Sequence, residues 1–125
     1  MSLNVTAQQI LKQLVSFDTT SYKSNLALVE FVQNYLRDYG INSQLVPDAS
    51  GKKANLYATI GANSERPDKG GIMLSGHTDV VPVAGQDWVT DPFTLVEQDG
   101  KLFARGSADM KGFIALVLSR VPAML

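Results

Sequence analysis

The chain contains a single histidine, His77, within the segment LSGHTDVVP at residues 74–82. An aspartate, Asp79, follows two positions later, and aliphatic residues flank the pair. In an extended segment the two side chains point to the same side, because side chains alternate along a strand. A neutral imidazole binds zinc through one ring nitrogen, and a carboxylate can hold the other nitrogen or take part in proton transfer. The pair is therefore a candidate metal-binding or acid–base site.

Both residues also have a structural interpretation. A lone histidine near a strand is commonly a hydrogen-bonded structural residue, and an H-x-D triplet is common in proteins. Asp79 can cap a turn, helped by Pro82 three positions later. The triplet alone leaves both interpretations open.

A second candidate carboxylate lies in ARGSADMKGF, residues 104–113. Asp109 precedes a predicted helix, where an aspartate is by default an N-cap. The flanking glycines allow close approach of the backbone, so this carboxylate can equally hold a metal. The segment is not a phosphate-binding loop, because Lys111 precedes Gly112 rather than following it. The sequence has no G-x-S-x-G and no cysteine, which removes support for serine and thiol nucleophiles and for thiolate zinc sites.

Helical signals begin close to the N-terminus. Thr6 followed by Gln9 predicts a capping box and a first helix that runs to about Ser16. Ser24 can cap a second helix, and Gly40 suits the left-handed position that ends it.

Strand signals follow in the middle of the chain. The segment NLYATI at 55–60 alternates, whereas INSQLV at 41–46 is a weaker candidate. The segment GIMLSG at 71–76 is an unbroken apolar run between glycines, which predicts a central strand covered on both faces. His77 and Asp79 then follow the carboxyl end of this strand, where the active sites of open α/β sheets collect.

The last third of the chain predicts a hairpin and a helix. Asp99-Gly100 is flanked by strand patterns and favours a type I′ turn, which needs positive φ at both central positions. The segment at 113–121 is apolar nearly all round, so we expect a helix buried between the sheet and further protein. Pro122 makes this helix hard to continue past Val121. Helices before and between strands indicate a layered α/β fold. Because the chain stops just past this apolar helix, we expect it to be a fragment.

Charge and hydropathy narrow the class of partner. The 11 basic and 12 acidic residues give a formal net charge of −1 without a block of like charge, which favours neither nucleic acid nor an anionic membrane. No apolar run approaches the ~20 residues that span a bilayer. The N-terminus lacks the basic and apolar regions of a signal peptide. We therefore expect a cytoplasmic protein.

Taken together, SGHTDVVP at 75–82 and WVTDPFTLVEQDGKLFARGSADMKGFIA at 88–115 resemble the N-terminal part of the M20 metallopeptidase family. Three separated motifs match in order and spacing, and the close resemblance covers residues 72–115. The resemblance implies a three-layer αβα domain with a mostly parallel, mixed central sheet. Residues 1–125 would be the N-terminal portion of the catalytic domain, without the smaller dimerisation domain and the C-terminal half.

The resemblance also implies a co-catalytic site with two Zn²⁺ ions, for which Co²⁺ is a substitute. His77 matches the histidine ligand of one metal, and Asp109 matches the carboxylate that bridges both. Asp79 matches the catalytic acid that supports the histidine. A cis peptide bond is implied between Asp109 and Met110. The family's glutamate base and remaining ligands have no counterpart here, since no Glu-Glu pair occurs in the chain.

The activity that the resemblance implies is hydrolysis of the amide bond of an N-acyl amino acid, a small-molecule substrate. The motif wording is most similar to family members that convert N-acetylornithine to ornithine and acetate in arginine biosynthesis, and a homodimer is implied for the full-length protein. Succinyl-diaminopimelate desuccinylation and hydrolysis of other N-acyl amino acids are alternatives, and a non-catalytic α/β binding or assembly module is an alternative from another class. Without the base, we expect these 125 residues alone to be inactive, to bind metal weakly and to associate through the apolar helix after Lys111.

Overall fold

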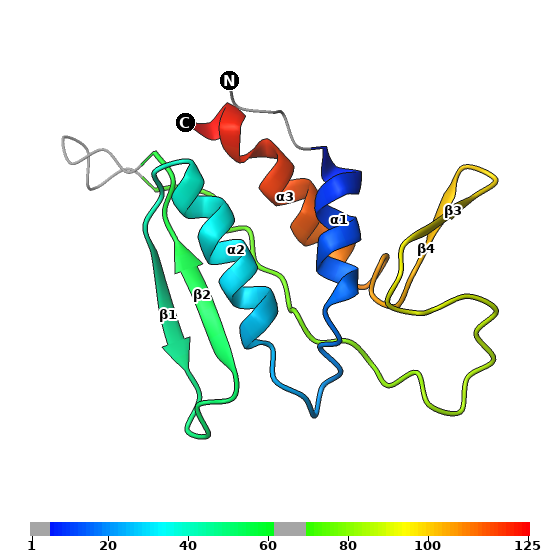
Figure 1. The fold of residues 1–125 in the computed structure, drawn as a ribbon. Helices are drawn as coiled ribbons and strands as arrows, with labels where there is room; N and C mark the ends of the chain where they lie inside the picture. The colour runs from blue at the N-terminus through cyan, green and yellow to red at the C-terminus, as the bar shows by residue number, and fades with distance from the viewer. Residues whose placement is uncertain (1–5, 62–69) are drawn as a thin grey trace.

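The computed structural model describes residues 6–61 and 70–125, so the polar loop expected at 61–70 falls mostly outside the described residues. The described part is a mixed α/β structure with three helices and two separate antiparallel strand pairs (Figure 1). In chain order the elements are α1 (Ala7–Ser16), α2 (Leu26–Asp38), β1 (Ser43–Pro47), β2 (Ala54–Ala58), β3 (Val96–Gln98), β4 (Lys101–Phe103) and α3 (Lys111–Met124).

The helix boundaries follow from local hydrogen bonds. The hydroxyl of Thr6 accepts from the Gln9 amide at 3.2 Å, and the Gln9 side chain accepts from the Thr6 amide at 2.8 Å. This confirms the predicted capping box. The N-cap of α2 is Asn25 and no side chain caps the helix, so the expected Ser24 cap is wrong; the Ser24 hydroxyl accepts from the Leu26 amide at 3.2 Å, one residue before the cap. Gly40 follows α2 with φ of 73°, as expected for a residue that ends a helix in the left-handed region.

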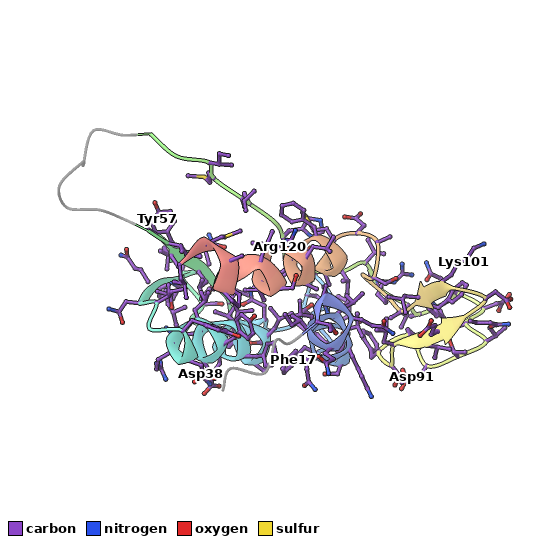
Figure 2. The ribbon with its side chains drawn as sticks, turned by 90° about the horizontal axis from the view of Figure 1, so that it is seen from above. Phe17, Asp38, Tyr57, Asp91, Lys101 and Arg120 are labelled. Carbon is purple, nitrogen blue, oxygen red and sulfur yellow. The ribbon has the colours of Figure 1, made fainter. Side chains whose placement is uncertain are left out.

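The two strand pairs are both hairpins. In the first, Ser43 lies opposite Ala58 and Pro47 lies opposite Ala54. In the second, β3 and β4 are joined by Asp99 and Gly100, whose φ values of 52° and 71° confirm the predicted turn. Figure 2 shows this second hairpin projecting away from the three helices.

The apolar core lies where the helices meet. In Figure 1, α1 lies along α3, and α2 covers one side of the β1–β2 pair. Each fully buried aliphatic side chain contributes about 1.5–3 kcal/mol relative to an exposed one. The central buried residues are Ile10, Leu11, Leu14 and Val15 of α1, Leu28, Val32 and Leu36 of α2, and Ala115, Leu118 and Val121 of α3.

Helix α3 continues through Pro122 to Met124, so the expectation that the helix stops at Val121 is wrong. A proline lacks the amide that would bond to the carbonyl four residues earlier, which here is that of Leu118. The hydroxyl of Tyr35 donates to this carbonyl at 2.8 Å. A side chain of α2 thereby replaces the lost donor, which allows the last turn to remain helical.

The expected mostly parallel central sheet is also not found among the described residues. Both sheets are antiparallel pairs, and residues 70–79 form no strand. Within this segment Ile72, Met73 and Leu74 are 89%, 77% and 50% exposed. A strand needs a neighbour to satisfy its backbone groups, and the described residues provide only an isolated parallel bridge between Thr20 and Val80. The apolar pattern was therefore insufficient to produce a strand.

Candidate metal site

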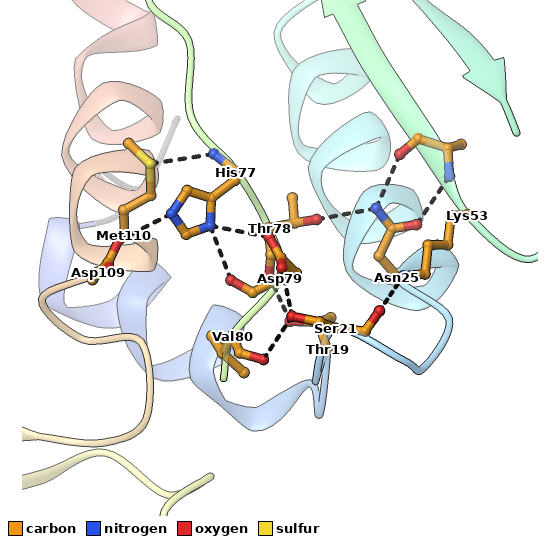
Figure 3. A network of polar contacts seen from close by, with 11 residues as sticks. Thr19, Ser21, Asn25, Lys53, His77, Thr78, Asp79, Val80, Asp109 and Met110 are labelled. Atoms are coloured by element: carbon orange, nitrogen blue, oxygen red, sulfur yellow. Dashed lines mark hydrogen bonds and ion pairs between the residues drawn. The ribbon is translucent and has the colours of Figure 1, made fainter. Parts of the chain in front are cut away.

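The structure brings His77, Asp79 and Asp109 together (Figure 3). The imidazole Nε2 of His77 lies 3.0 Å from Oδ1 of Asp109. The other ring nitrogen, Nδ1, lies 3.2 Å from Oδ1 of Asp79 and 3.0 Å from the Asp79 carbonyl oxygen. The ring therefore stands between two carboxylates that are 30 positions apart in the sequence, with a different nitrogen facing each.

The turn after α1 holds the histidine segment in place. The Thr19 hydroxyl donates to the carbonyl of Thr78 at 2.6 Å, and the Val80 amide donates to the carbonyl of Thr19 at 3.1 Å. The Ser21 amide then donates to the carbonyl of Val80 at 3.0 Å. These contacts fix the backbone of the segment without a strand on either side.

The side chains of this segment alternate, although the segment is not a strand. His77 reaches Asp109 and Asp79 turns toward the His77 ring and Ser21, whereas Thr78 points toward Asn25 at the start of α2 (Figure 3). The Asn25 side chain donates to the Thr78 hydroxyl at 3.0 Å and also exchanges two hydrogen bonds with the backbone of Ala54. Asn25 therefore ties the histidine segment to β2 on the side away from the site.

Asp109 sits in a loop that packs closely on the histidine segment. The peptide bond between Asp109 and Met110 is cis, as the resemblance implied. The His77 amide donates to the Met110 sulfur at 3.2 Å. Gly106 has φ of 86°, and a Cβ there would approach Val80 Cγ1 to 2.7 Å, so this close contact requires glycine.

The structure does not use Asp109 as a helix cap. The N-cap of α3 is Met110, and no side chain caps the helix there. The Asp109 carboxylate is 88% exposed, and its described hydrogen bond goes to His77. The default interpretation of this aspartate as an N-cap is therefore wrong, and its carboxylate is available for another role.

Opposite charges around the ring shift the ionisation of the site. Partial burial lowers the pKa of His77, but the hydrogen bonds to the Asp79 carbonyl and to Asp109, together with the charges of both carboxylates, outweigh it and raise the pKa above the usual value. The hydrogen bond from Ser21, and then the charge of His77, outweigh partial burial and lower the pKa of Asp79. Both shifts favour the charged forms of His77 and Asp79 relative to the unfolded chain.

Two residues outside the predicted set support this arrangement. Lys111 is fully buried at the start of α3, and its ammonium group donates to the carbonyl of Phe17 at 2.7 Å. Burial lowers the pKa of Lys111 to about 8, although the charge of Asp18 opposes this shift. Ser21 donates to the Asp79 carboxylate at 2.6 Å. The sequence marked the Ser21 region only as polar and turn-rich, because its partners lie far away along the chain.

His77 Nε2 and the Asp109 carboxylate are two donors of the types that zinc binds. Zinc binds imidazole nitrogen and carboxylate oxygen at about 2.0–2.2 Å, which places two donors of one tetrahedral ion about 3.3 Å apart. The observed separation of Nε2 and Oδ1 is 3.0 Å. Within residues 6–61 and 70–125, no group of three or more His, Cys, Asp or Glu side chains is arranged to hold a metal. These residues thus provide a pair of donors and not a complete set.

The pair opens into a hollow of about 210 Å³. His77, Asp79 and Asp109 line it together with residues 80–81 and 104–108, and no glutamate is among these lining residues. The hollow is large enough to admit a small acyl group beside the donor pair.

None of the described helices is long and apolar enough to cross a membrane.

Comparisons with known proteins agree on one family. Residues 73–125 match the family model described as peptidase family M20/M25/M40. The acetylornithine deacetylase of Yersinia pseudotuberculosis serotype O:1b (strain IP 31758) is 44% identical over 106 residues, covering 83% of this chain and 27% of that protein. The acetylornithine deacetylase of Pasteurella multocida (strain Pm70) is 42% identical over 107 residues, covering 85% and 27%.

A solved structure is also similar to this chain in its fold. The crystal structure of human carnosine dipeptidase 1 matches with a TM-score of 0.79 and 28% identity, covering 94% of this chain and 27% of that chain. The chain therefore spans about a quarter of the length of the proteins that it matches.

Proposed function

Because this chain is related to the M20 peptidases over the N-terminal part of their length, we propose that it carries part of the metal site of a zinc-dependent amidohydrolase. The observation that carries the proposal is the position of His77, with Nδ1 facing Asp79 and Nε2 facing Asp109. One nitrogen is held by the carbonyl oxygen of Asp79 and lies beside the carboxylate of the same residue, and the other lies beside a second, exposed carboxylate. This is the arrangement of a histidine that is oriented for a metal.

Each of the three residues has a proposed role. His77 Nε2 and the Asp109 carboxylate would hold the metal. The Asp79 carbonyl oxygen, 3.0 Å from Nδ1, accepts from Nδ1–H, and the Asp79 carboxylate lies 3.2 Å from the same nitrogen, so the lone pair of Nε2 would face the ligand position. The metals are two Zn²⁺ ions, with Co²⁺ as a substitute. When bound, they would polarise an amide carbonyl and lower the pKa of a bound water.

The substrate that we favour is an N-acyl amino acid, and first among these N-acetylornithine, which would yield ornithine and acetate. The names of the bacterial relatives support this choice. Desuccinylation of succinyl-diaminopimelate and hydrolysis of other N-acyl amino acids are the alternatives within the family. A cytoplasmic homodimer is proposed for the full-length protein, in which residues 1–125 form the N-terminal portion of the catalytic domain.

These residues alone are expected to lack activity. No glutamate of residues 6–61 and 70–125 lines the hollow, and general acid–base assistance contributes typically ~10²–10⁴-fold. Two ligands also leave a zinc ion short of the three that catalytic sites normally provide. Robust turnover of N-acetylornithine by a homogeneous 125-residue preparation would contradict this expectation.

A non-catalytic binding or assembly module is the second candidate. The exposed apolar residues Ile72, Met73 and Leu116 favour it, because they offer a surface for another protein. Light scattering over a range of concentrations tests the association that this surface predicts. A strictly monomeric chain at high concentration would count against it.

Metal binding tests the favoured proposal directly. The chain, purified without chelators, is titrated with Zn²⁺ and with Co²⁺ by calorimetry. We expect weak binding that Asp109→Asn reduces at least about tenfold, because this change removes a charged ligand and preserves the size of the side chain. The matched control, Asp38→Asn at the end of α2, removes the same charge away from the site. Equal affinities for the two variants would refute the proposed ligand pair.

A further inference from the structure

Ser21 touches the supporting carboxylate from the side opposite the histidine. Its hydroxyl donates to Oδ2 of Asp79 at 2.6 Å, while Oδ1 of the same carboxylate lies 3.2 Å from Nδ1 of His77 (Figure 3). The hydroxyl also lies 3.3 Å from the Val80 carbonyl. Its single proton favours the shorter, charge-assisted bond to the carboxylate. Each oxygen of Asp79 therefore has a different partner, which limits rotation of the carboxylate.

Ser21 is itself held by its backbone. Its amide donates to the carbonyl of Val80 at 3.0 Å, and its carbonyl accepts from the ammonium group of Lys53, next to β2. The amide of Val80 in turn donates to the carbonyl of Thr19. Since the contacts to Val80 and Lys53 use main-chain atoms of Ser21, they fix the position of its hydroxyl without depending on the hydroxyl.

We infer that Ser21 is a positioning residue for the proposed metal site, a conclusion that rests on the proposed function. Its hydroxyl orients the Asp79 carboxylate, this carboxylate and the Asp79 carbonyl oxygen together hold Nδ1 of His77, and the ring presents Nε2 beside Asp109. The three successive contacts measure 2.6, 3.2 and 3.0 Å. Loss of an outer partner of a ligating histidine typically lowers metal affinity ~10–100-fold, so removal of this hydroxyl should have an effect of that order.

Three substitutions separate this role from a merely structural one. Ser21→Ala removes the hydroxyl and retains the main-chain contacts, whereas Ser21→Thr retains both. Ser24→Ala is the matched control, because it removes a hydroxyl from the same turn, where that hydroxyl contacts the Leu26 amide and not Asp79. Thermal unfolding of each variant establishes that it is folded before metal is added.

The measurement is nuclear magnetic resonance of the His77 ring, which is unambiguous because the chain has one histidine. We expect Ser21→Ala to speed exchange of the Nδ1 proton in metal-free protein and to raise the Zn²⁺ dissociation constant at least about tenfold. The Zn²⁺ dissociation constants of Ser21→Thr and Ser24→Ala should stay within about twofold of that of the original chain, because the effect is confined to the hydroxyl–carboxylate contact.

The outcomes distinguish the inference from its premise. If the original chain binds Zn²⁺ through His77, and Ser21→Ala binds equally well with unchanged ring resonances, the inference on Ser21 is overturned while the proposed function stands. If Zn²⁺ leaves the ring resonances of the original chain unchanged, the proposed function fails. In that case, exchange of the Nδ1 proton still tests the Ser21 contact by itself. If exchange is unchanged in Ser21→Ala, the hydroxyl does not position the ring, and the inference on Ser21 is overturned as well.

Discussion

The contact between α1 and α3 and the segment at 70–79 are both rich in aliphatic residues, yet they differ completely in burial. Ile10 and Leu14 are 1% and 0% exposed, whereas Ile72 and Met73 are 89% and 77% exposed. A helix satisfies its backbone internally, so an apolar stripe is enough to bring it into a core. An apolar strand candidate depends on neighbouring strands. The site-bearing segment is held by polar contacts to residues 19–21 and to Asn25 and by the buried Val80, whereas Ile72 and Met73 contribute little burial.

The largest expected effect compares the two regions directly. Leu14→Ala should destabilise the chain by about 2–5 kcal/mol, because it leaves a cavity between α1 and α3. The same deletion at Leu74, which is 50% exposed, should cost less than about 1 kcal/mol. Urea unfolding of the two variants measures both values. Similar losses of unfolding free energy would mean that the segment is part of the core.

The buried ammonium group of Lys111 provides a second test of how burial affects stability. The pKa of Lys111 is lowered to about 8 by burial, from an ordinary value of 10.5. Between these values the unfolded chain binds more protons than the folded chain, so stability should rise with pH. The expected gain is up to about 3 kcal/mol across this window.

Urea unfolding at several pH values measures that gain, and Lys111→Met serves as the comparison. The variant retains the aliphatic stem, which packs near Gly106, and removes the titrating group. Its stability should lack the rise between about pH 8 and 10.5. A rise of the same size in both proteins would assign the effect to other groups.

A smaller effect is expected where α2 supports the end of α3. Tyr35→Phe removes the hydroxyl that donates to the Leu118 carbonyl, so the chain should lose about 1 kcal/mol of unfolding free energy. Tyr57→Phe, on the 55% exposed side chain in β2, is the control. Faster amide exchange in the last turn of α3 should accompany the loss in the first variant. Identical behaviour of the two variants would show that the hydroxyl does not support the helix.

The smallest effect should come from His77, in the exposed region. Its pKa is raised by the Asp79 carbonyl and by the two carboxylates, which outweigh partial burial. Its contribution to stability is therefore complete below the ordinary value of 6.5 and is lost as pH rises through the higher folded value. Because the side chain is 49% exposed, this loss should be much smaller than the Lys111 effect and opposite in sign. Urea unfolding of the original chain and of His77→Gln at several pH values tests this prediction. An equal loss of stability in the variant would show that the histidine does not cause the loss.

Local sequence signals were sufficient for elements that depend on near neighbours. The capping box at Thr6, the glycine after α2 and the turn at Asp99-Gly100 each act through contacts within a few residues. The segment at 71–76 was predicted as a strand and is not one among the described residues, because its outcome depends on partners elsewhere. Pro122 was misread for a related reason, since the donor that replaces its amide comes from α2.

The candidate site divides in the same way. His77, Asp79 and Asp109 were recognisable because their residue types and spacing resemble a known family. Ser21 and Lys111 were not, because a serine in a turn and a lysine at a helix start are unremarkable until the fold brings them to Asp79 and Phe17. Residues that support a site through tertiary contacts leave little trace in a single sequence.

The most direct test of the central claim follows the two ring nitrogens of His77 by ¹⁵N resonance while Zn²⁺ is added. The account predicts that the Nε2 resonance shifts on binding, that Nδ1 keeps its proton against Asp79, and that Asp109→Asn suppresses the shift. A ring that ignores Zn²⁺, or that binds it through Nδ1, would contradict the assignment of His77 and Asp109 as a metal-binding pair.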